Sequence, residues 1–382
     1  MKIGVLTLPL HANYGGNLQV WALMTALKDM GHDAWLIDRH RNHISWWRLP
    51  LELGKRAVLK YGARRPGVSF RKNILDRKER ELYELHSARF IAEHLAPSTE
   101  QFHSTRQIRD RIKQHQFDAI IVGSDQVWRR EYAPNIQDYF LGFLPEGASP
   151  RRISYAASFG TDKWRLTPAQ TQACSKLLKK FDAVSVRESS GIRLCREYLG
   201  ADAVHVLDPT MLLDAERYLQ LLPEKQPPAQ KLGRLFTYLL DNEPVKLQAL
   251  ERIAQQTRLT PTDVTGRQVG DMLSKPATAP PVENWIRGFR DAEFVFTDSF
   301  HGCVFSILFN KPFVAIGNPK RGLARFESLL EMFGLKNRLV ISSNEVTADL
   351  LNAPIDWNAV NRVLHDKRQS SVGFLASALA GV

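Results

Sequence analysis

Short apolar runs alternate with amphipathic segments along most of the chain. The apolar runs predict β-strands over residues 3–8, 34–38, 117–122, 153–157, 183–186 and 205–207. Between them, apolar residues at helical spacing predict helices over residues 18–30, 168–180 and 189–199, with further helical segments between residues 73 and 115. This alternation predicts an α/β domain with a largely parallel sheet over residues 1–213.

A proline-bearing polar stretch interrupts this pattern. Residues 214–231 contain LLPEKQPPAQK and predict a linker. The α/β pattern resumes over residues 232–355, with strands expected at 234–240, 294–297 and 313–317. Residues 356–382 predict a helical tail that packs back on the first domain. Two Rossmann-like domains facing a cleft would give an architecture like that of the GT-B glycosyltransferases.

The composition is that of an ordinary soluble globular protein, and the length favours two domains. The 382 residues are 44% hydrophobic and 24% charged. The most apolar region, residues 293–316, is interrupted by Asp298, His301 and Lys311, so it does not predict a membrane-spanning helix. The N-terminal run fits a first β-strand better than a signal peptide, because it lacks a small-residue cleavage site. We therefore expect a cytoplasmic protein.

Cysteine use argues against a disulfide framework and a structural zinc site. Cys174, Cys195 and Cys303 are odd in number and widely separated. We expect reduced cysteines in the core, no metal and no cofactor.

Most of the net charge of +12 comes from one segment. Residues 39–80, a basic insertion in the first domain, contain thirteen Lys or Arg against three acids. Basic residues there lie beside tryptophans and leucines, a combination typical of a membrane-surface element, whereas a solvated basic insertion is the alternative. The candidate membrane contacts are Trp46, Trp47, Arg48, Lys55 and Arg56. Because the basic patch is local and lacks a nucleic-acid motif, we expect no nucleic-acid partner.

His301 follows a hydrophobic strand and precedes a hydrophobic helix, in the stretch FTDSFHG. The N-terminus of a helix attracts anions through its free amides and its dipole. A histidine there can serve as a general acid when a bound phosphate favours its cationic form. A structural histidine beside the core is the alternative.

Two further motifs follow strands in the first domain. Asp125, in GSDQVW, could orient a sugar hydroxyl or take its proton, or it could simply cap a helix. The glycine-rich stretch NYGGN at residues 13–17 could form a cradle of backbone amides. It lacks the GK[ST] ending of a nucleotide-binding P-loop.

Arginines near strand ends offer anion contacts. Arg187, in SVRE, could bind a carboxylate or phosphate, or form an ion pair with a neighbouring acid. Arg321 and Arg325 raise the same two possibilities. Asp208, in LDPT, is a further acid at a strand end, or part of a turn that starts a helix.

In order and spacing, these stretches resemble the polysaccharide pyruvyl transferase family. The resemblance spans residues 1 to about 340 and is most specific in DSFHG and GSDQVW. It is carried by NYGGNLQVWAL, GSDQVW, SFGTD, SVRE, LDPTMLL, TYLLD, FTDSFHGCVFSILFNKPFVAIG and RFESLLEMFGL. The basic segment and the tail carry none of it.

The resemblance implies a GT-B-like fold and transfer of the enolpyruvyl unit of phosphoenolpyruvate to two hydroxyls of a sugar. It implies that His301 is the catalytic acid and that Arg187 contacts phosphoenolpyruvate. Some relatives carry an arginine where this chain has Ser299, so Arg325 is our candidate for the second donor cation. We expect Ser299, His301 and Gly302 to contact the donor as well. Asp125 is our candidate for the base.

The acceptor is expected to be a sugar, lipid-linked because of the basic tryptophan-containing segment. The expected acceptor contacts are Asn13, Tyr14, Gly15, Gly16, Asn17, Ser124, Asp125, Gln126 and Trp128. A protein with these properties would act in the cytoplasm, at the inner face of the membrane.

Two other functions are compatible with the pattern. One is a GT-B glycosyltransferase that uses a nucleotide sugar, although its usual diphosphate contacts in the second domain are not evident. The other is a non-catalytic protein that binds a glycan or a membrane surface.

Overall fold

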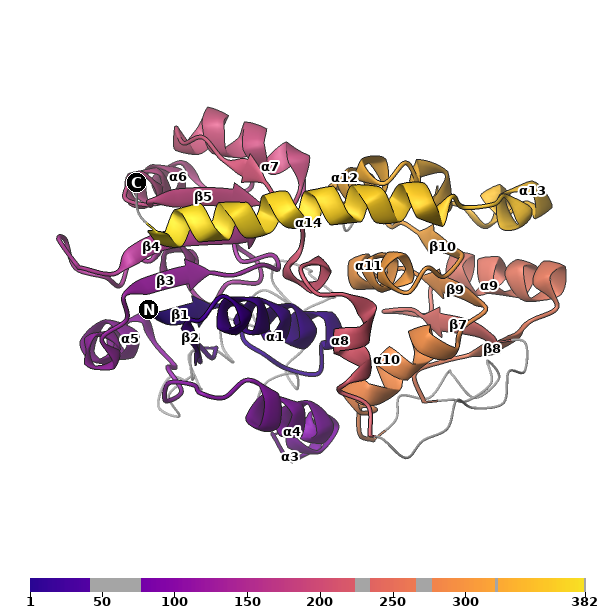
Figure 1. Cartoon of the computed structure of the whole chain (residues 1–382), viewed down its shortest axis with the longest axis horizontal. Coiled ribbons are helices and arrows are strands. Elements are labelled where there is room, and N and C mark those ends of the chain that lie inside the picture. Colours follow the sequence, from indigo (N-terminus) through magenta and orange to yellow (C-terminus); the bar gives the residue numbers. More distant parts are fainter. Residues whose placement is uncertain (42–76, 224–233, 266–276, 320–321, 381–382) are drawn as a thin grey trace, which may run out of the picture.

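The computed structural model describes residues 1–41, 77–223, 234–265, 277–319 and 322–380. It consists of two α/β domains, each built on a parallel sheet flanked by helices (Figure 1). The expected fold class, two Rossmann-like domains facing a cleft, is confirmed. The membrane-contact candidates Trp46, Trp47, Arg48, Lys55 and Arg56 lie outside the described residues.

The first sheet has six parallel strands in the order β2-β1-β3-β4-β5-β6. They are β1 (Lys2–Leu6), β2 (Asp33–Ile37), β3 (Ala119–Val122), β4 (Arg151–Ala157), β5 (Ala183–Val186) and β6 (Val204–His205). The register pairs Val5 with Ile121, and both are fully buried. Because helices cover the sheet, its central strands are apolar on both faces.

The second sheet has five parallel strands in the order β11-β10-β9-β7-β8. They are β7 (Arg234–Tyr238), β8 (Thr260–Thr262), β9 (Phe294–Thr297), β10 (Phe313–Ile316) and β11 (Leu339–Val340). In each sheet the chain reverses its direction of strand addition once, between β1 and β3 in the first sheet and between β7 and β9 in the second. Open α/β sheets bind ligands outside the carboxyl ends of the strands at such switch points.

Helices connect the strands in both domains. In the first domain they are α1 (Tyr14–Asp29), α3 (Arg77–Tyr83), α4 (Leu85–His94), α5 (Thr105–Arg111), α6 (Pro168–Leu178) and α7 (Ser189–Leu194), which continues into a π-helical turn (Cys195–Leu199). Between the two sheets lies α8 (Ala215–Leu219). The second domain contains α9 (Pro244–Thr257), α10 (Val282–Asp291), α11 (Phe300–Leu308), α12 (Ala324–Met332) and α13 (Ala348–Asn352).

The last helix, α14 (Trp357–Ala380), runs from the second domain back across the first (Figure 1). Arg151 of β4 donates from Nε to the carbonyl of Ala378 at 2.9 Å, and Ser371 accepts from the Leu207 amide at 3.0 Å. The ring of Phe374 lies 6.4 Å from that of Tyr155. The C-terminal segment therefore packs against the sheet of the first domain.

The start of the first helix needs correction, and the structure adds detail to the expected linker. The helix expected over residues 18–30 already begins at Tyr14, because the Asn13 side chain caps α1 by accepting from the Gly16 amide. The expected linker at 214–231 begins with α8, whose Tyr218 is fully buried and donates to the Thr210 carbonyl at 2.7 Å. Tyr218 therefore anchors the first part of this segment in the core.

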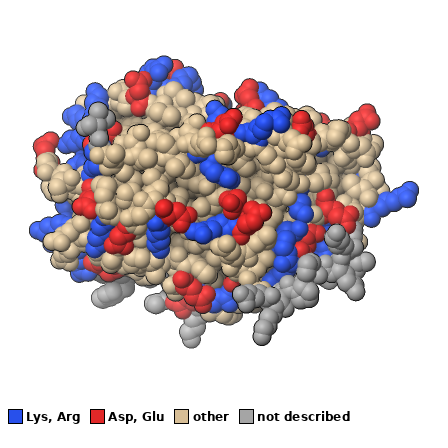
Figure 2. All heavy atoms as spheres, viewed as in Figure 1, with Lys and Arg blue, Asp and Glu red and all other residues tan. Residues whose placement is uncertain are grey.

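On the face shown in Figure 2, Lys and Arg side chains are interspersed with Asp and Glu. Within the described residues, no helix combines the length and the apolar character needed to cross a bilayer.

Candidate active site

A cavity of about 530 Å³ lies between the two domains. It is lined by the segments that follow the switch-point strands, β1 and β3 in the first sheet and β7 and β9 in the second. The polar and aromatic residues around it include Asn13, Arg41, Asp125, Gln126, Arg129 and Tyr132 from the first domain, and Tyr238, Ser299, His301, Asn318 and Arg325 from the second. This volume falls within the range of small-molecule sites in proteins.

Two helices present their N-termini to this cavity. Asn13 is the N-cap of α1 and Ser299 is the N-cap of α11, and both line the wall. The first amides of a helix have no partner within the helix, and its dipole places partial positive charge at that end. The cavity is therefore suited to an anion.

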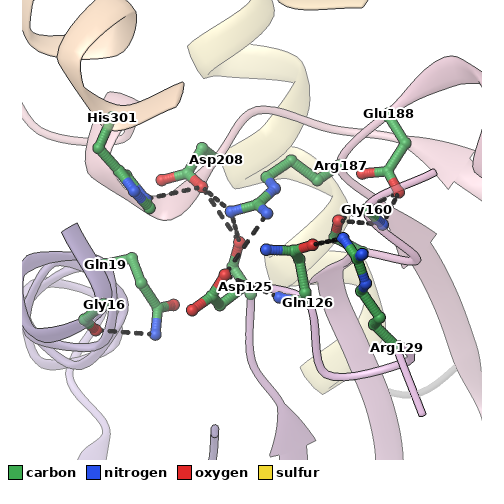
Figure 3. A network of polar contacts seen from close by, with 12 residues as sticks. Gly16, Gln19, Asp125, Gln126, Arg129, Gly160, Arg187, Glu188, Asp208 and His301 are labelled. Atoms are coloured by element: carbon green, nitrogen blue, oxygen red, sulfur yellow. Dashed lines mark hydrogen bonds and ion pairs between the residues drawn. The ribbon is translucent and has the colours of Figure 1, made fainter. Parts of the chain in front are cut away.

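The ring of His301 is held between two elements of the first domain. On one side it packs against α1, where a Cβ atom added to Gly15 would lie 2.1 Å from Nδ1 of His301. On the other side, Nε2 lies 3.7 Å from Oδ2 of Asp208 (Figure 3). This separation is an ion-pair distance and too long for a hydrogen bond. His301 lines the cavity, and its side chain is 8% exposed.

Asp208 connects the histidine to Arg187. Its Oδ2 accepts from Arg187 Nη1 at 2.9 Å and from Ser124 Oγ at 3.1 Å, and its Oδ1 accepts from Thr210 Oγ1 at 2.6 Å. Burial would raise the pKa of Asp208, but His301 and Arg187 together hold it well below its usual range. Asp208 is thus an ionised, buried carboxylate that contacts both side chains.

Arg187 lies behind the cavity wall. Its side chain is 1% exposed, and the ring of Phe300 covers the guanidinium at 4.6 Å. Nη2 lies 3.7 Å from Oδ1 of Asp125, in addition to the bond with Asp208. Arg187 is therefore not among the residues that line the cavity, because the two carboxylates and Phe300 enclose it.

Asp125 has an unusual backbone conformation. Its φ angle is +75°, in the left-handed region that few residues other than glycine adopt, and its Oδ1 accepts from the Gln126 amide at 2.8 Å. The turn directs the carboxylate toward Arg187 and the cavity (Figure 3). With 13% of its side chain exposed, Asp125 is the accessible carboxylate of this network, whereas that of Asp208 is fully buried.

Arg325 provides a cation without a counter-ion. It lines the cavity near Phe300, and its guanidinium has no hydrogen-bond or ion-pair partner among the described residues. Burial, followed by repulsion from Arg187, lowers the pKa of Arg325 to about 10. The group is still charged at neutral pH, so an incoming anion would stabilise it.

Asp298, three residues before His301 in the chain, is bound by groups of its own domain. Its Oδ2 accepts from Lys246 Nζ at 2.6 Å, and its Oδ1 accepts from the Leu240 amide at 2.7 Å. It therefore fixes the segment after β7, and Asp208 is the carboxylate beside the ring.

Several other expected contacts lie outside the cavity wall. Trp128 is 1% exposed, donates from Nε1 to the Tyr139 carbonyl and stacks on Phe140, so it belongs to the core of the first domain. Tyr14 donates to the Pro280 carbonyl and stacks on Trp285, so it joins the two domains.

The remaining expected contacts also support the wall from behind. Asn17 is fully buried and donates to the His11 carbonyl, and Ser124 is buried against Asp208. Gly302 packs on Thr297, where a Cβ atom would lie 2.1 Å from Oγ1. Of the expected acceptor contacts, Asn13, Asp125 and Gln126 line the cavity, as do Ser299, His301 and Arg325 of the expected donor contacts.

The cysteines are buried and unpaired. Burial raises the pKa of Cys174 and of Cys195 to about 12. Over the described ranges, no group of three or more His, Cys, Asp or Glu side chains could hold a metal ion.

Sequence reasoning missed three contributors to the site. Arg129 and Tyr132 lie just after GSDQVW, three residues apart, and line the cavity, and the ring of Phe300 contacts both Arg187 and Arg325. Their position in the first turns after β3 and β9 was the available signal, because such turns lie at the ligand edge of an α/β sheet.

Comparisons with known proteins identify the family of the chain and relate its fold to solved structures. The family model for polysaccharide pyruvyl transferase matches residues 13–320. No curated protein sequence matches the chain. The structure resembles that of UDP-GlcNAc 2-epimerase from Neisseria meningitidis, with a TM-score of 0.54 and 12% identity over 98% of this chain and 100% of that one. It also resembles the epimerase from Methanocaldococcus jannaschii, with a TM-score of 0.50 and 11% identity over 96% and 99% of the two chains. At these identities, the likeness to the two epimerases is one of fold alone.

Proposed function

The chain belongs to the polysaccharide pyruvyl transferase family, and we propose that it moves the enolpyruvyl unit of phosphoenolpyruvate onto two hydroxyls of one sugar. The products are a cyclic pyruvate ketal and inorganic phosphate. The observation that carries this proposal is the placement of an unpaired arginine, Arg325, in the same cavity as His301 and two helix N-termini. A small donor with several negative charges fits that arrangement.

The donor's phosphate and carboxylate would bind Arg325 and the amides at the N-terminus of α11. Ser299 occupies the N-cap there and lines the cavity. Arg187, which lies behind Phe300, would support the site by holding the carboxylates of Asp125 and Asp208 in place. These fixed positive groups also stabilise the leaving phosphate, since they need no reorganisation during the reaction.

His301 would donate a proton to the methylene carbon of phosphoenolpyruvate. That carbon becomes the methyl group, and the adjacent carbon becomes an oxocarbenium centre that the first sugar hydroxyl attacks. Phosphate then leaves by cleavage of the carbon–oxygen bond, and the second hydroxyl adds to the same carbon. The ionised Asp208, 3.7 Å from Nε2, attracts the positive charge that the ring carries before it gives up its proton.

Asp125 is our candidate for the base that accepts a hydroxyl proton. It is the exposed carboxylate of the network, and its left-handed backbone turn places it at the cavity. A strained turn that positions a functional carboxylate is common at active sites.

We further propose that the acceptor is a lipid-linked precursor of a cell-surface polysaccharide, met by a cytoplasmic protein at the inner face of the membrane. The support is the basic, tryptophan-containing composition of residues 39–80. Binding to vesicles that contain anionic lipid, compared with neutral vesicles, tests this part separately.

The reaction is tested by phosphate release from phosphoenolpyruvate in the presence of a panel of glycans. His301→Ala should abolish release, whereas His365→Ala, on the exposed side of α14, should leave it unchanged. Calorimetry with phosphoenolpyruvate and with UDP separates this function from that of a nucleotide-sugar transferase. Binding of UDP without binding of phosphoenolpyruvate would favour the latter.

A further inference from the structure

The cavity has a second region on the first domain, formed by three residues that follow β3. Gln126, Arg129 and Tyr132 are spaced three residues apart, and all three line the cavity. They lie on the same turn-rich segment as Asp125, the candidate base. This region therefore adjoins the reaction centre.

The amide of Gln126 is held in one orientation. Its Oε1 accepts from Arg129 Nη1 at 2.8 Å (Figure 3). Its side chain packs on Gly160, where a Cβ atom would lie 2.0 Å from Oε1, and the Gly160 amide donates to Glu188 at 3.0 Å. Because Oε1 is occupied, the amide presents its Nε2 hydrogens, for which the described residues supply no acceptor.

Tyr132 presents a flat apolar surface at the same place. It is 40% exposed, a large value for an aromatic residue in a cavity wall. The Arg129 guanidinium lies 4.7 Å from the centre of its ring and covers one face. A ligand can therefore stack only on the opposite face. Across the cavity, Leu240 of the second domain is 54% exposed and adds a second apolar surface.

A rigid amide donor beside an exposed aromatic face matches the two-sided chemistry of a pyranose. The ring of such a sugar has apolar C–H faces and hydroxyls around its edge. We propose that Gln126 and Tyr132 form the subsite for the acceptor sugar, with Tyr132 stacked on a C–H face and Gln126 donating to a hydroxyl. Arg129 is a positioning residue for both, through its bond to Gln126 and its contact with Tyr132.

This subsite deepens the proposed function, on which it rests for the identity of the reaction. It assigns recognition of the acceptor to the first domain, whereas Arg325 and the N-terminus of α11 would hold the donor on the second. The two substrates would then meet between Asp125 and His301, one from each domain.

The test measures sugar binding without turnover. Saturation-transfer NMR with methyl pyranosides of glucose, galactose, mannose and N-acetylglucosamine identifies a ligand of the wild-type protein, and titration gives its affinity. Tyr132→Ala should weaken that affinity by about tenfold or more, and Tyr132→Phe and Tyr132→Trp should retain it. Gln126→Ala should weaken it as well, because one hydrogen bond to a hydroxyl is lost.

Tyr198→Ala is the matched control. Tyr198 is also 40% exposed, but it stacks on Trp164 at 4.5 Å and lies outside the cavity wall. This variant should bind the sugar like the wild type, and every variant should bind phosphoenolpyruvate within about twofold of it.

Two results would overturn the subsite. One is a wild-type protein that binds none of the four pyranosides, and the other is a pyranoside affinity that Tyr132→Ala leaves unchanged. Failure to bind phosphoenolpyruvate or to release phosphate, with pyranoside binding still dependent on Tyr132, would count against the proposed reaction and support the subsite.

Discussion

Gly15 lies directly against the ring of His301, so that a Cβ atom on Gly15 would stand 2.1 Å from Nδ1 of the histidine. The contact joins the first turn of α1 to the first turn of α11, and hence one domain to the other. Glycine at this position allows the candidate acid to rest on the opposite helix. The glycine at position 15 is thus explained by the close approach of the His301 side chain.

Gly15→Ala should therefore displace the ring of His301. Because small displacements of a reacting group cost about a hundredfold in rate, we expect a loss of that order in kcat for phosphate release. Gly373→Ala is the control, since Gly373 lies within α14 with open space around it, and alanine there should keep activity and slightly stabilise the helix. Unchanged kcat in Gly15→Ala would contradict the role given to this contact.

Asp208→Asn should lower the free energy of unfolding at neutral pH and make it less dependent on pH in the acidic range. It leaves Arg187 buried with a weaker partner, which costs about 3 kcal/mol at neutral pH. The pKa of Asp208 is lower in the folded than in the unfolded chain, so its contribution is present above the unfolded value, near 4, and is lost as the pH falls below it. The difference in unfolding free energy between wild type and variant should thus shrink below about pH 4.

Denaturant titrations at several pH values measure this difference. Asp202→Asn, at a side chain that is 88% exposed, should behave like the wild type throughout. If the difference in unfolding free energy between wild type and Asp208→Asn stays constant down to pH 3, Asp208 is not ionised in the folded protein.

Arg325→Ala should have opposite effects on stability and on donor binding. Removing a poorly solvated cation that has no counter-ion among the described residues should raise the melting temperature of the unliganded protein. The same change should weaken binding of phosphoenolpyruvate by about tenfold or more, because a charge-assisted contact is lost. Calorimetry and thermal unfolding measure the two effects, with Arg106→Ala on the surface of α5 as the control. Unchanged donor affinity would remove Arg325 from the donor site.

Trp128→Phe should affect stability and leave the substrates' KM values unchanged. Trp128 donates to the Tyr139 carbonyl and stacks on Phe140, so the loss of its indole costs packing and one hydrogen bond, about 1–3 kcal/mol in total. Denaturant unfolding and acceptor titration separate the two effects. A raised KM for the acceptor with unchanged stability would instead indicate that Trp128 contacts the acceptor.

The sequence was sufficient to predict the two α/β domains, because fully apolar strands alternate with amphipathic helices in both. It also placed His301, Asp125 and Gln126 at strand ends, and these three line the cavity. It did not distinguish residues at the cavity from residues behind it. Trp128 shares the motif GSDQVW with Asp125 and Gln126, but side-chain direction after a turn depends on packing that a linear pattern does not encode.

The partner of His301 illustrates the same limit. Asp298 is three residues from the histidine in the chain, yet Lys246 and the Leu240 amide occupy it. Asp208, from the other domain, reaches the ring through tertiary structure. Likewise, Arg129 and Tyr132 belong to none of the motifs, and only their position in the cavity wall identifies them as candidate site residues.

The central claim, that His301 protonates phosphoenolpyruvate during transfer to a sugar, is tested most directly by mass spectrometry of the glycan product formed in heavy water. With the wild-type protein we predict a glycan that has gained a pyruvate ketal with one deuterium in its methyl group, and with His301→Gln we predict no ketal. A wild-type product without deuterium in the methyl group, or a ketal formed at the normal rate by His301→Gln, would contradict the account.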